Sequence, residues 1–371
     1  MKELLKQLIQ AESTESCGEL NSAKVIYDEF ARYGIKSEIE TWDNTRANIT
    51  AHIKSSGKKP ALLFACHIDV VGPGKAKWTN PPFTAVETDG KIYGRGSTDM
   101  KGGTAAAATA ICEIVKSGVE LQGDIIFTAV AGEETDSCGA LRFMAKKDQI
   151  PKLQGVLIPE PTDFTIVSAH RGILWLDIST KGIAAHGSTP HLGVNAITSM
   201  RRFLNELDNY DIAAKQTNEI LGTCSMSVNT ISGGKTRNAV PDQCSCSIDI
   251  RIIPGVDTQD IMNDFRNIIA KVKSEHPEFE AKVSIDRQAS PLETDRNSDF
   301  VKDFCTCLGI EKTVAVGFTT DGPHFVDLGA PILIYGPGKP DICHKPDEFI
   351  EIADAEKAVQ DYKKLITKFL T

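Results

Sequence analysis

The residues best suited to chemistry in this chain lie between Ala61 and Gly103. His67 and Asp69 end the apolar run ALLFACHIDVV, and Asp99 follows in the glycine-rich turn GRGSTDMKGG. In a strand, residues i and i+2 point to the same face, so His67 and Asp69 share a side. A metal-binding histidine usually donates its second ring N–H to a carboxylate. Asp69 is therefore expected to orient His67 if the turn brings it behind the ring. A buried structural histidine with a polar neighbour would show the same pair.

Further acidic groups and a second histidine also follow apolar runs. Glu133 and Glu134 come after FTAVAG, Glu160 comes after VLIP, and His344 lies in CHKPDEF after PILIYGPG. In doubly wound sheets, ligands bind beyond the carboxyl ends of the strands. We therefore expect one crevice to gather His67, Asp99, Glu133, Glu134, Glu160 and His344.

Two histidines with three carboxylates form a nitrogen- and oxygen-rich ligand set. Such a set suits zinc, with cobalt or manganese as alternatives. A single catalytic zinc needs three protein ligands, so five ligands indicate two metal ions that share a bridging carboxylate, as in hydrolytic sites with ions about 3.5–4 Å apart. The side chains of the adjacent Glu133 and Glu134 diverge. One of them can bind metal while the other faces the bound water as a general base.

Composition excludes several other classes of protein. A chain of 371 residues is long enough for two domains. The net charge of −9 argues against a nucleic-acid or anionic-membrane surface. The start MKELLKQLIQ is typical of an amphipathic helix rather than a signal peptide, and no run of 18 apolar residues occurs. We expect a cytoplasmic protein with no nucleic-acid or membrane partner.

The pattern of elements predicts two domains. Near-continuous apolar strands alternate with helices up to residue 171, which indicates an α/β fold with a mixed, mostly parallel sheet between helices. From Gly172 a period of two appears, with helices predicted over 195–207 and 257–273, and the buried pattern then returns and ends in a helix over 353–369. We expect a catalytic domain formed by 1–171 and 288–371, with a smaller α+β lid or dimerisation domain inserted over 172–287.

Together these motifs resemble a known family of metallopeptidases and deacylases. His67-x-Asp69, Gly-Arg-Gly-x-x-Asp99-x-Lys-Gly-Gly, Glu133-Glu134, Pro-Glu160-Pro and His344-Lys-Pro-Asp-Glu are similar to the dinuclear zinc family of acetylornithine deacetylase, succinyl-diaminopimelate desuccinylase, aminoacylase and glutamate carboxypeptidase, over nearly the whole chain.

The resemblance implies a role for each of these residues. One metal would be held by His67, Asp99 and Glu160, and the other by Asp99, Glu134 and His344, with Asp99 as the bridge. Glu133 would be the general base and Asp69 would orient His67. A glutamate at position 160 resembles the deacylases and carboxypeptidases more than the aminopeptidases.

The middle of the chain also resembles this family. AAHGSTPHLGVNAI is similar to the lid and dimerisation domain, which implies that His186 reaches the partner subunit's site and polarises the substrate carbonyl; a loop histidine is the alternative. Arg251 would pair with a free substrate carboxylate, although a surface salt bridge would explain it too. The resemblance implies further substrate contacts at Asn238, Thr319, Thr320 and Gly322.

The expected function is metal-dependent hydrolysis of the amide bond of an N-acyl amino acid, as in acetylornithine deacetylase or succinyl-diaminopimelate desuccinylase. A dipeptidase or carboxypeptidase that uses the same site is the alternative. A binding protein that kept the fold but lost catalysis is a third possibility, and the complete set of ligands plus base argues against it. The resemblance also implies a homodimer formed through the inserted domain.

Overall fold

The computed structural model describes residues 1–371, and these form two compact units. The first consists of Met1–Ser168, Thr294–Val314 and Thr320–Thr371, and the second of Ala169–Glu293 with the short segment Ala315–Thr319. In sequence, the second unit interrupts the first. The role of this segment as a lid or dimerisation domain stays a prediction.

A mixed sheet forms the centre of the first unit, in the order β1-β2-β6-β3-β7-β17. Its strands are β1 (Ser37–Trp42), β2 (Arg46–Ile53), β3 (Lys59–His67), β6 (Gly123–Val130), β7 (Leu153–Ile158) and β17 (Ile332–Ile334). β3 runs parallel to both β6 and β7, and β17 runs parallel to β7. β2 runs antiparallel to its neighbours β1 and β6. The predicted α/β fold with a mostly parallel sheet is therefore confirmed.

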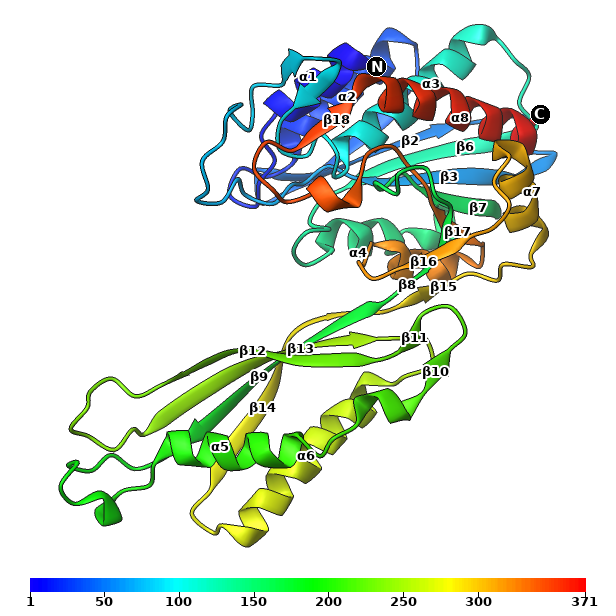
Figure 1. The fold of residues 1–371 in the computed structure, drawn as a ribbon. Helices are drawn as coiled ribbons and strands as arrows, with labels where there is room; N and C mark the ends of the chain where they lie inside the picture. The colour runs from blue at the N-terminus through cyan, green and yellow to red at the C-terminus, as the bar shows by residue number, and fades with distance from the viewer. The chain divides into compact units, whose positions relative to one another are not determined.

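Helices cover both faces of this sheet, which explains why its strands are apolar on both sides. Figure 1 shows α1 (Lys2–Gln10), α2 (Leu20–Arg32), α3 (Lys101–Ser117) and α8 (Ile352–Leu370) on one face and α4 (Cys138–Met144) on the other. Helix α7 (Asp299–Leu308) packs against α8. The buried alanines of α3 let this helix approach the sheet closely, as the run GTAAAATA predicts.

The apolar run LLFACHIDVV predicts a single strand over 62–71, and this prediction is too long. β3 ends at His67, and the chain then turns, with the backbone N–H of Ile68 bonded to Val130 and that of Val70 bonded to Ser13. Ile68 and Val70 are nevertheless buried. The apolar run continues past the strand because burial, rather than strand pairing, requires it.

A small sheet of three-residue strands escapes prediction, because such strands are too short to show a period of two. It consists of β4 (Val86–Thr88), β5 (Lys91–Tyr93) and β18 (Phe349–Glu351), in the order β18-β5-β4. Its pairs include Phe349 with Tyr93. This sheet joins the segment before Asp99 to the segment after His344.

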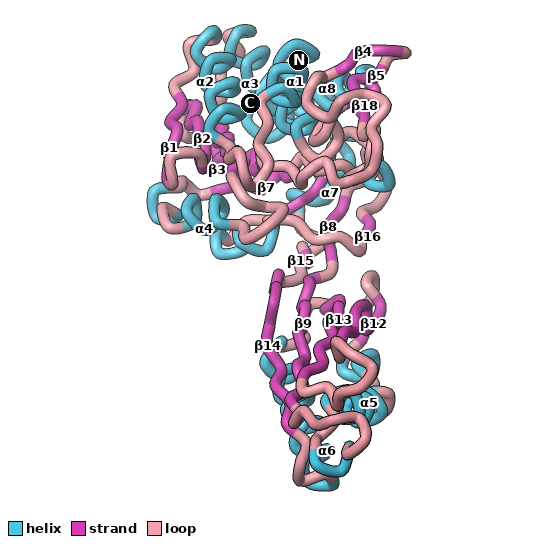
Figure 2. The backbone as a smooth tube through the Cα atoms, turned by 90° about the vertical axis from the view of Figure 1, so that its left-hand side faces the viewer, coloured by secondary structure: helices cyan, strands magenta, loops and turns pink.

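The second unit is a four-stranded antiparallel sheet with two helices on one face (Figure 2). Its order is β12-β13-β9-β14, from β9 (Gly172–Lys181), β12 (Ser225–Gly233), β13 (Gln243–Ile252) and β14 (Glu280–Ala289). Helices α5 (Ala196–Leu207) and α6 (Thr258–Glu275) bury Met200, Phe203 and Phe265 in the unit's own core. Two further short strands, β10 (Thr217–Asn218) and β11 (Gly222–Thr223), pair with each other. The other short strands lie outside the four-stranded sheet and are β8 (Val167–His170), β15 (Leu292–Glu293) and β16 (Val314–Val316).

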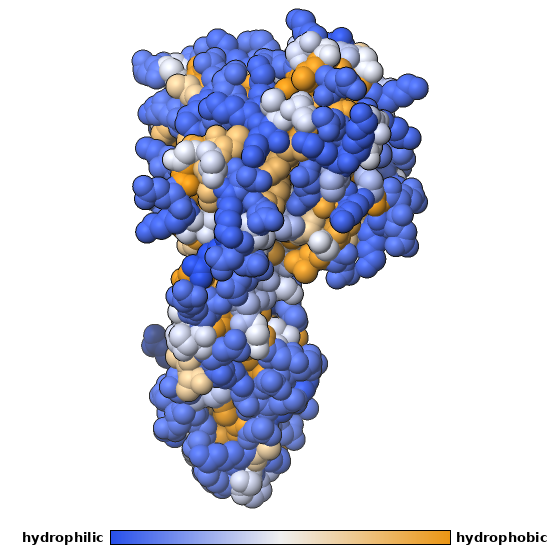
Figure 3. Space-filling view, turned by 90° about the vertical axis from the view of Figure 1, so that its right-hand side faces the viewer, coloured by the Kyte–Doolittle hydropathy of each residue, from blue (hydrophilic) through white to orange (hydrophobic).

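One face of the molecule has few apolar regions. Figure 3 shows a mostly hydrophilic face on which apolar residues gather in small, separate patches. None of the helices combines the length and the apolar character needed to span a bilayer.

Candidate metal centre

The central strands bring the predicted ligands to one edge of the sheet. β3 ends at His67, which is in register with Val130 on the parallel strand β6. Glu133 and Glu134 follow β6, and Glu160 follows β7 on the other side of β3. Because the carboxyl ends of parallel strands share an edge, three segments distant in sequence end side by side.

Asp99 lies between two histidines. Its Oδ1 atom is 3.3 Å from Nε2 of His67, and its Oδ2 atom is 3.1 Å from Nε2 of His344. Each histidine also approaches a second carboxylate: His67 lies 3.3 Å from Oε1 of Glu160, and His344 lies 2.9 Å from Oε1 of Glu134. The five side chains therefore form two overlapping groups that share Asp99.

The ligand atoms are close enough to hold metal ions. One atom each from His67, Asp99 and Glu134 lies within 4.8 Å of the others. His67 and Glu160 are buried, whereas the side chain of His344 is half exposed, at 49%. One end of the site is thus enclosed by the sheet and the other opens to solvent.

The electrostatics of this group require added positive charge. Burial raises the pKa of Glu160 to about 7, opposed by His67 and assisted by Asp99. Burial opposes the charged form of His67, but Glu160, Asp69 and Asp99 outweigh it and raise its pKa well above the ordinary value. Hydrogen bonds that His344 donates to Asp99 and Glu134 raise the pKa of His344 to about 10. The carboxylates draw protons onto both histidines, and divalent cations would supply the same compensation. The donor set and its charge fit two metal ions.

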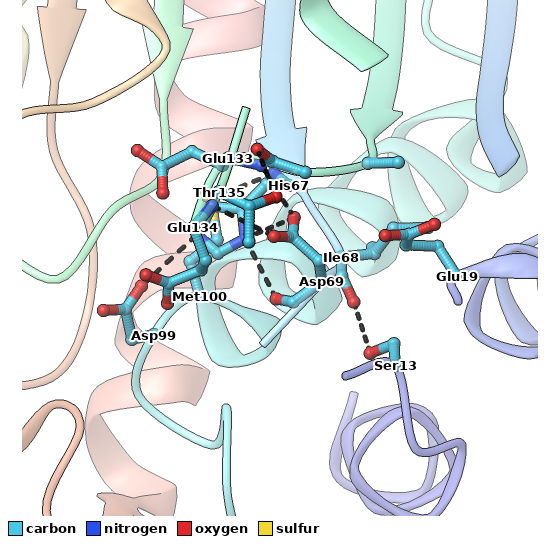
Figure 4. Close-up of polar contacts among 12 residues, drawn as sticks. Ser13, Glu19, His67, Ile68, Asp69, Asp99, Met100, Glu133, Glu134 and Thr135 are labelled. Atoms are coloured by element: carbon cyan, nitrogen blue, oxygen red, sulfur yellow. Dashed lines mark hydrogen bonds and ion pairs between the residues drawn. The ribbon is translucent and has the colours of Figure 1, made fainter. Parts of the chain in front are cut away.

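Asp69 contacts the site from behind. Nδ1 of His67 lies 3.1 Å from the backbone oxygen of Asp69 and 3.4 Å from its carboxylate. The two carboxylate oxygens also accept the backbone N–H groups of Glu133 at 3.1 Å and Glu134 at 3.0 Å. Figure 4 shows these contacts of Asp69 as dashed lines. The sequence predicted the contact of Asp69 with His67, but not its hydrogen bonds with the backbone N–H groups of Glu133 and Glu134.

Glu133 is a partly buried acid with an acidic neighbour. Burial raises its pKa well above the ordinary value, and although His67 opposes this shift, Asp321 and Glu134 add to it. Asp321 is itself 5% exposed, and neither of its carboxylate oxygens makes a hydrogen bond. Burial raises the pKa of Asp321 as well, while the nearby Ser137 side chain lowers it. The sequence pattern gives Asp321 no role, because a single acid after a loop carries no pattern.

The predicted substrate contacts are divided between the two units. Thr320 and Gly322 belong to the first unit, where the Thr320 hydroxyl accepts the backbone N–H of Gly322 at 3.0 Å. His186, Asn238, Arg251 and Thr319 belong to the second unit.

Within the second unit, the segments of His186 and Asn238 lie side by side. His186 pairs with Ala239, and the N–H of Gly187 bonds to the oxygen of Asn238 at 2.7 Å. Arg251 forms a two-pronged ion pair with Asp249, at 2.9 and 3.0 Å. The salt bridge named as its alternative is therefore present, and the roles of these residues toward substrate stay predictions.

Comparisons with known proteins agree with the chemistry of this site. The family model for peptidase family M20/M25/M40 matches residues 63–368. A protein of Staphylococcus aureus strain MRSA252 named "Probable succinyl-diaminopimelate desuccinylase" is 33% identical, over 99% of this chain and 97% of its own length. An acetylornithine deacetylase of Proteus mirabilis is 31% identical, over 91% of this chain and 86% of its own. The crystal structure of an M20 family metallo-carboxypeptidase from Sulfolobus solfataricus shares the fold with a TM-score of 0.81 at 20% identity, over 99% of this chain and 98% of its own.

Proposed function

This chain belongs to peptidase family M20/M25/M40 and is a hydrolase of amide bonds, and we propose that it removes the acyl group from an N-acyl amino acid. The observation that carries the proposal is the position of Asp99. Its two oxygens point to two different histidines, and each histidine has a further carboxylate beside it. This arrangement fits a dinuclear centre in which His67, Asp99 and Glu160 hold one ion and Asp99, Glu134 and His344 hold the other.

The proposed metal is zinc, with cobalt or manganese as alternatives. Two such ions, when bound, would lower the pKa of a water molecule toward neutrality and polarise the substrate carbonyl. The chain itself then needs a group that accepts and returns a proton. Glu133 fits this role because its burial and its acidic neighbours raise its pKa, so that it holds a proton long enough to deliver it to the departing amine.

The remaining roles fall to residues that recognise the substrate. His186 would donate to the oxyanion of the tetrahedral intermediate. Arg251 would bind the carboxylate of the amino-acid part, since Asp249 occupies Nε and Nη2 but leaves Nη1 available. The loop residues Asn238, Thr319, Thr320 and Gly322 would line the pocket.

Two proposals on substrate are supported unequally. Relatives named as desuccinylase and deacetylase exceed 30% identity over most of the chain, and they favour an N-succinyl or N-acetyl amino acid. A dipeptide or a peptide with a free carboxyl end is the second candidate, and the fold shared with a metallo-carboxypeptidase supports it.

A homodimer formed through the second unit is part of the proposal. β12 lies at the edge of its sheet, and most of its side chains are exposed, including Val228 at 42% and Ile231 at 59%. An edge strand with apolar side chains is suited to pairing with another copy of the chain.

A hydrolysis screen tests the function. Protein freed of metal and reloaded with Zn²⁺ or Co²⁺ is given N-succinyl, N-acetyl and N-formyl amino acids and, in parallel, dipeptides. We expect turnover of an acyl amino acid that requires added metal. Turnover of dipeptides alone would favour the second candidate, and no turnover of either class with two metals bound would contradict the proposal.

The variant Glu133→Gln tests the general base. It should keep two metal equivalents, measured by mass spectrometry, and lose about 10²–10⁴-fold in kcat. Glu120→Gln, which removes the same charge from an exposed site, is the matched control and should behave as wild type. Near-normal turnover by Glu133→Gln would exclude Glu133 as the base.

A further inference from the structure

Glu348 is a buried carboxylate four residues after His344. Its side chain is fully buried and accepts four hydrogen bonds, all from one short segment. The donors are the guanidinium of Arg95 and three backbone N–H groups, those of Gly96 at 3.1 Å, Thr98 at 2.9 Å and Asp99 at 3.1 Å. The charge of Arg95 and the three amides together compensate a carboxylate that has lost its water.

Backbone bonds strengthen the same connection. The N–H of Gly94 donates to the backbone oxygen of Glu348 at 2.8 Å, and the Thr98 hydroxyl donates to that of Phe349. Phe349 in turn pairs with Tyr93 across β5 and β18. The segment that carries Asp99 is thus held along its length by the segment that follows His344.

The neighbouring acid acts in the same way on another loop. One carboxylate oxygen of Asp347 accepts the N–H groups of Thr79 at 2.9 Å and Asn80 at 2.8 Å. The indole of Trp78, next in the chain, lies 5.2 Å from the Arg95 guanidinium. The two acids after His344-Lys-Pro therefore hold separate loops, and the two loops meet again at Arg95.

The position of these bonds gives them a consequence for the metal centre. Glu348 bonds the N–H of Asp99 itself, and the Asp99 carboxylate reaches His344 at 3.1 Å. Asp99 and His344 lie far apart in sequence, and Glu348 connects the two segments that carry them. Because Asp99 belongs to both ligand groups, a shift of its backbone changes both groups. His344 belongs to the second group only, so the separation of Asp99 from His344 matters for the second ion.

We propose that Glu348 is a positioning residue for the dinuclear centre, which sets Asp99 against His344 so that the second metal ion can bind. The proposal rests on the proposed function, since it requires Asp99 to bridge two ions. It assigns Glu348 no contact with the substrate or with the metals.

The variant Glu348→Gln tests this role, because it keeps the shape of the side chain but replaces one acceptor oxygen with an N–H₂ group that faces N–H donors. Metal-free protein is titrated with Zn²⁺ against a chromophoric chelator. We expect the second equivalent to bind about 10–100-fold more weakly than in wild type, the range found for groups that orient metal ligands. The first equivalent should change less, and the visible spectrum of the Co²⁺ form should lose the signal of the second ion.

Glu351→Gln is the matched control. Glu351 lies on the same strand β18, and its side chain is 41% exposed and 3.5 Å from Lys91. It loses the same charge without touching the Asp99 segment, so both equivalents should bind as in wild type.

Two results distinguish a failure of the positioning role of Glu348 from a failure of the proposed function. If wild type binds two ions and folded Glu348→Gln binds both with unchanged affinity, the positioning role is wrong and the proposed function stands. If wild type itself binds fewer than two ions, both the positioning role of Glu348 and the proposed dinuclear function are wrong. Should Glu348→Gln fail to fold, Glu348→Asp replaces it, because it keeps the charge beside Arg95 but withdraws from the amides. Unchanged affinity for the second ion in Glu348→Asp also overturns the proposal.

Discussion

Asp69 shows at the scale of single residues how one carboxylate can serve two partners. It lies behind the His67 ring, and its two oxygens accept the N–H groups of Glu133 and Glu134. The same side chain therefore supports one residue proposed to bind metal and the segment proposed to carry the base. A loss of Asp69 should disturb the alignment of these groups more than it removes any ligand.

We expect Asp69→Asn to reduce kcat by about 10–100-fold while two metal equivalents remain bound. The amide keeps one acceptor oxygen, so it can hold only one of the two N–H groups, and its own N–H₂ group faces the other. Activity and metal content are measured on the same preparation. Asp148→Asn, at an exposed position, is the control. A parallel loss of metal and activity would contradict a positioning role.

His170 predicts how stability depends on pH. It is fully buried, and burial lowers its pKa to about 4, although bonds to backbone groups oppose the shift. Between pH 6.5 and 4 the unfolded chain binds a proton at this residue and the folded chain does not. Stability that is present above pH 6.5 is therefore lost as the pH falls, by about 2 kcal/mol at pH 5.

Urea unfolding between pH 7 and pH 5 measures this contribution. His170→Gln should show a shallower dependence on pH than wild type, whatever its stability at pH 7, because the group that binds the proton is gone. The same slope in both proteins would mean that His170 is protonated in the folded chain.

At the scale of elements, the approach of helix α3 to the segment after β7 depends on a glycine. A Cβ atom on Gly103 would lie 1.9 Å from the backbone oxygen of Pro159, next to Glu160. Alanine normally favours a helix over glycine by about 1 kcal/mol. Forcing an atom into such a contact costs about 1–3 kcal/mol or more, so the steric term should prevail.

Gly103→Ala is thus expected to lower the melting temperature and to weaken metal binding, because the Pro159–Glu160 segment must move. Gly72→Ala, at a position with no heavy atom within 4 Å of the added carbon, should leave both unchanged. A Gly103→Ala protein as stable as wild type would show that the helix moves away without cost.

At the scale of the whole molecule, the proposed dimer predicts complementation between two inactive variants. If His186 acts in the partner subunit's site, a mixed dimer of Glu133→Gln and His186→Ala contains one complete site. Random exchange of subunits in a two-fold dimer would then restore about a quarter of wild-type activity. Activity is measured after mixing, unfolding and refolding the two variants together. No recovery from a mixture that sediments as a dimer would place His186 within its own subunit or outside catalysis.

Much of the fold can be predicted from the sequence, because the spacing of apolar residues indicates which face of a helix or strand is buried. The helices predicted over 195–207, 257–273 and 353–369 differ from α5, α6 and α8 by two residues or fewer at each end. Strand ends are less certain, since Ile68 and Val70 stay buried after β3 has ended. The three-residue strands β4, β5 and β18 show no period at all, although they connect two parts of the site.

Residue types and their places after apolar runs predict which side chains gather at the proposed metal centre, because ligand chemistry depends on residue type and the carboxyl ends of parallel strands converge. The hydrogen bonds that position these side chains appear only in the folded structure. The contacts of Asp69 with two backbone amides and of Glu348 with the Asp99 segment follow no repeat or spacing. They arise where buried carboxylates find donors on segments that folding brings together, and burial makes such partners obligatory wherever the chain supplies them.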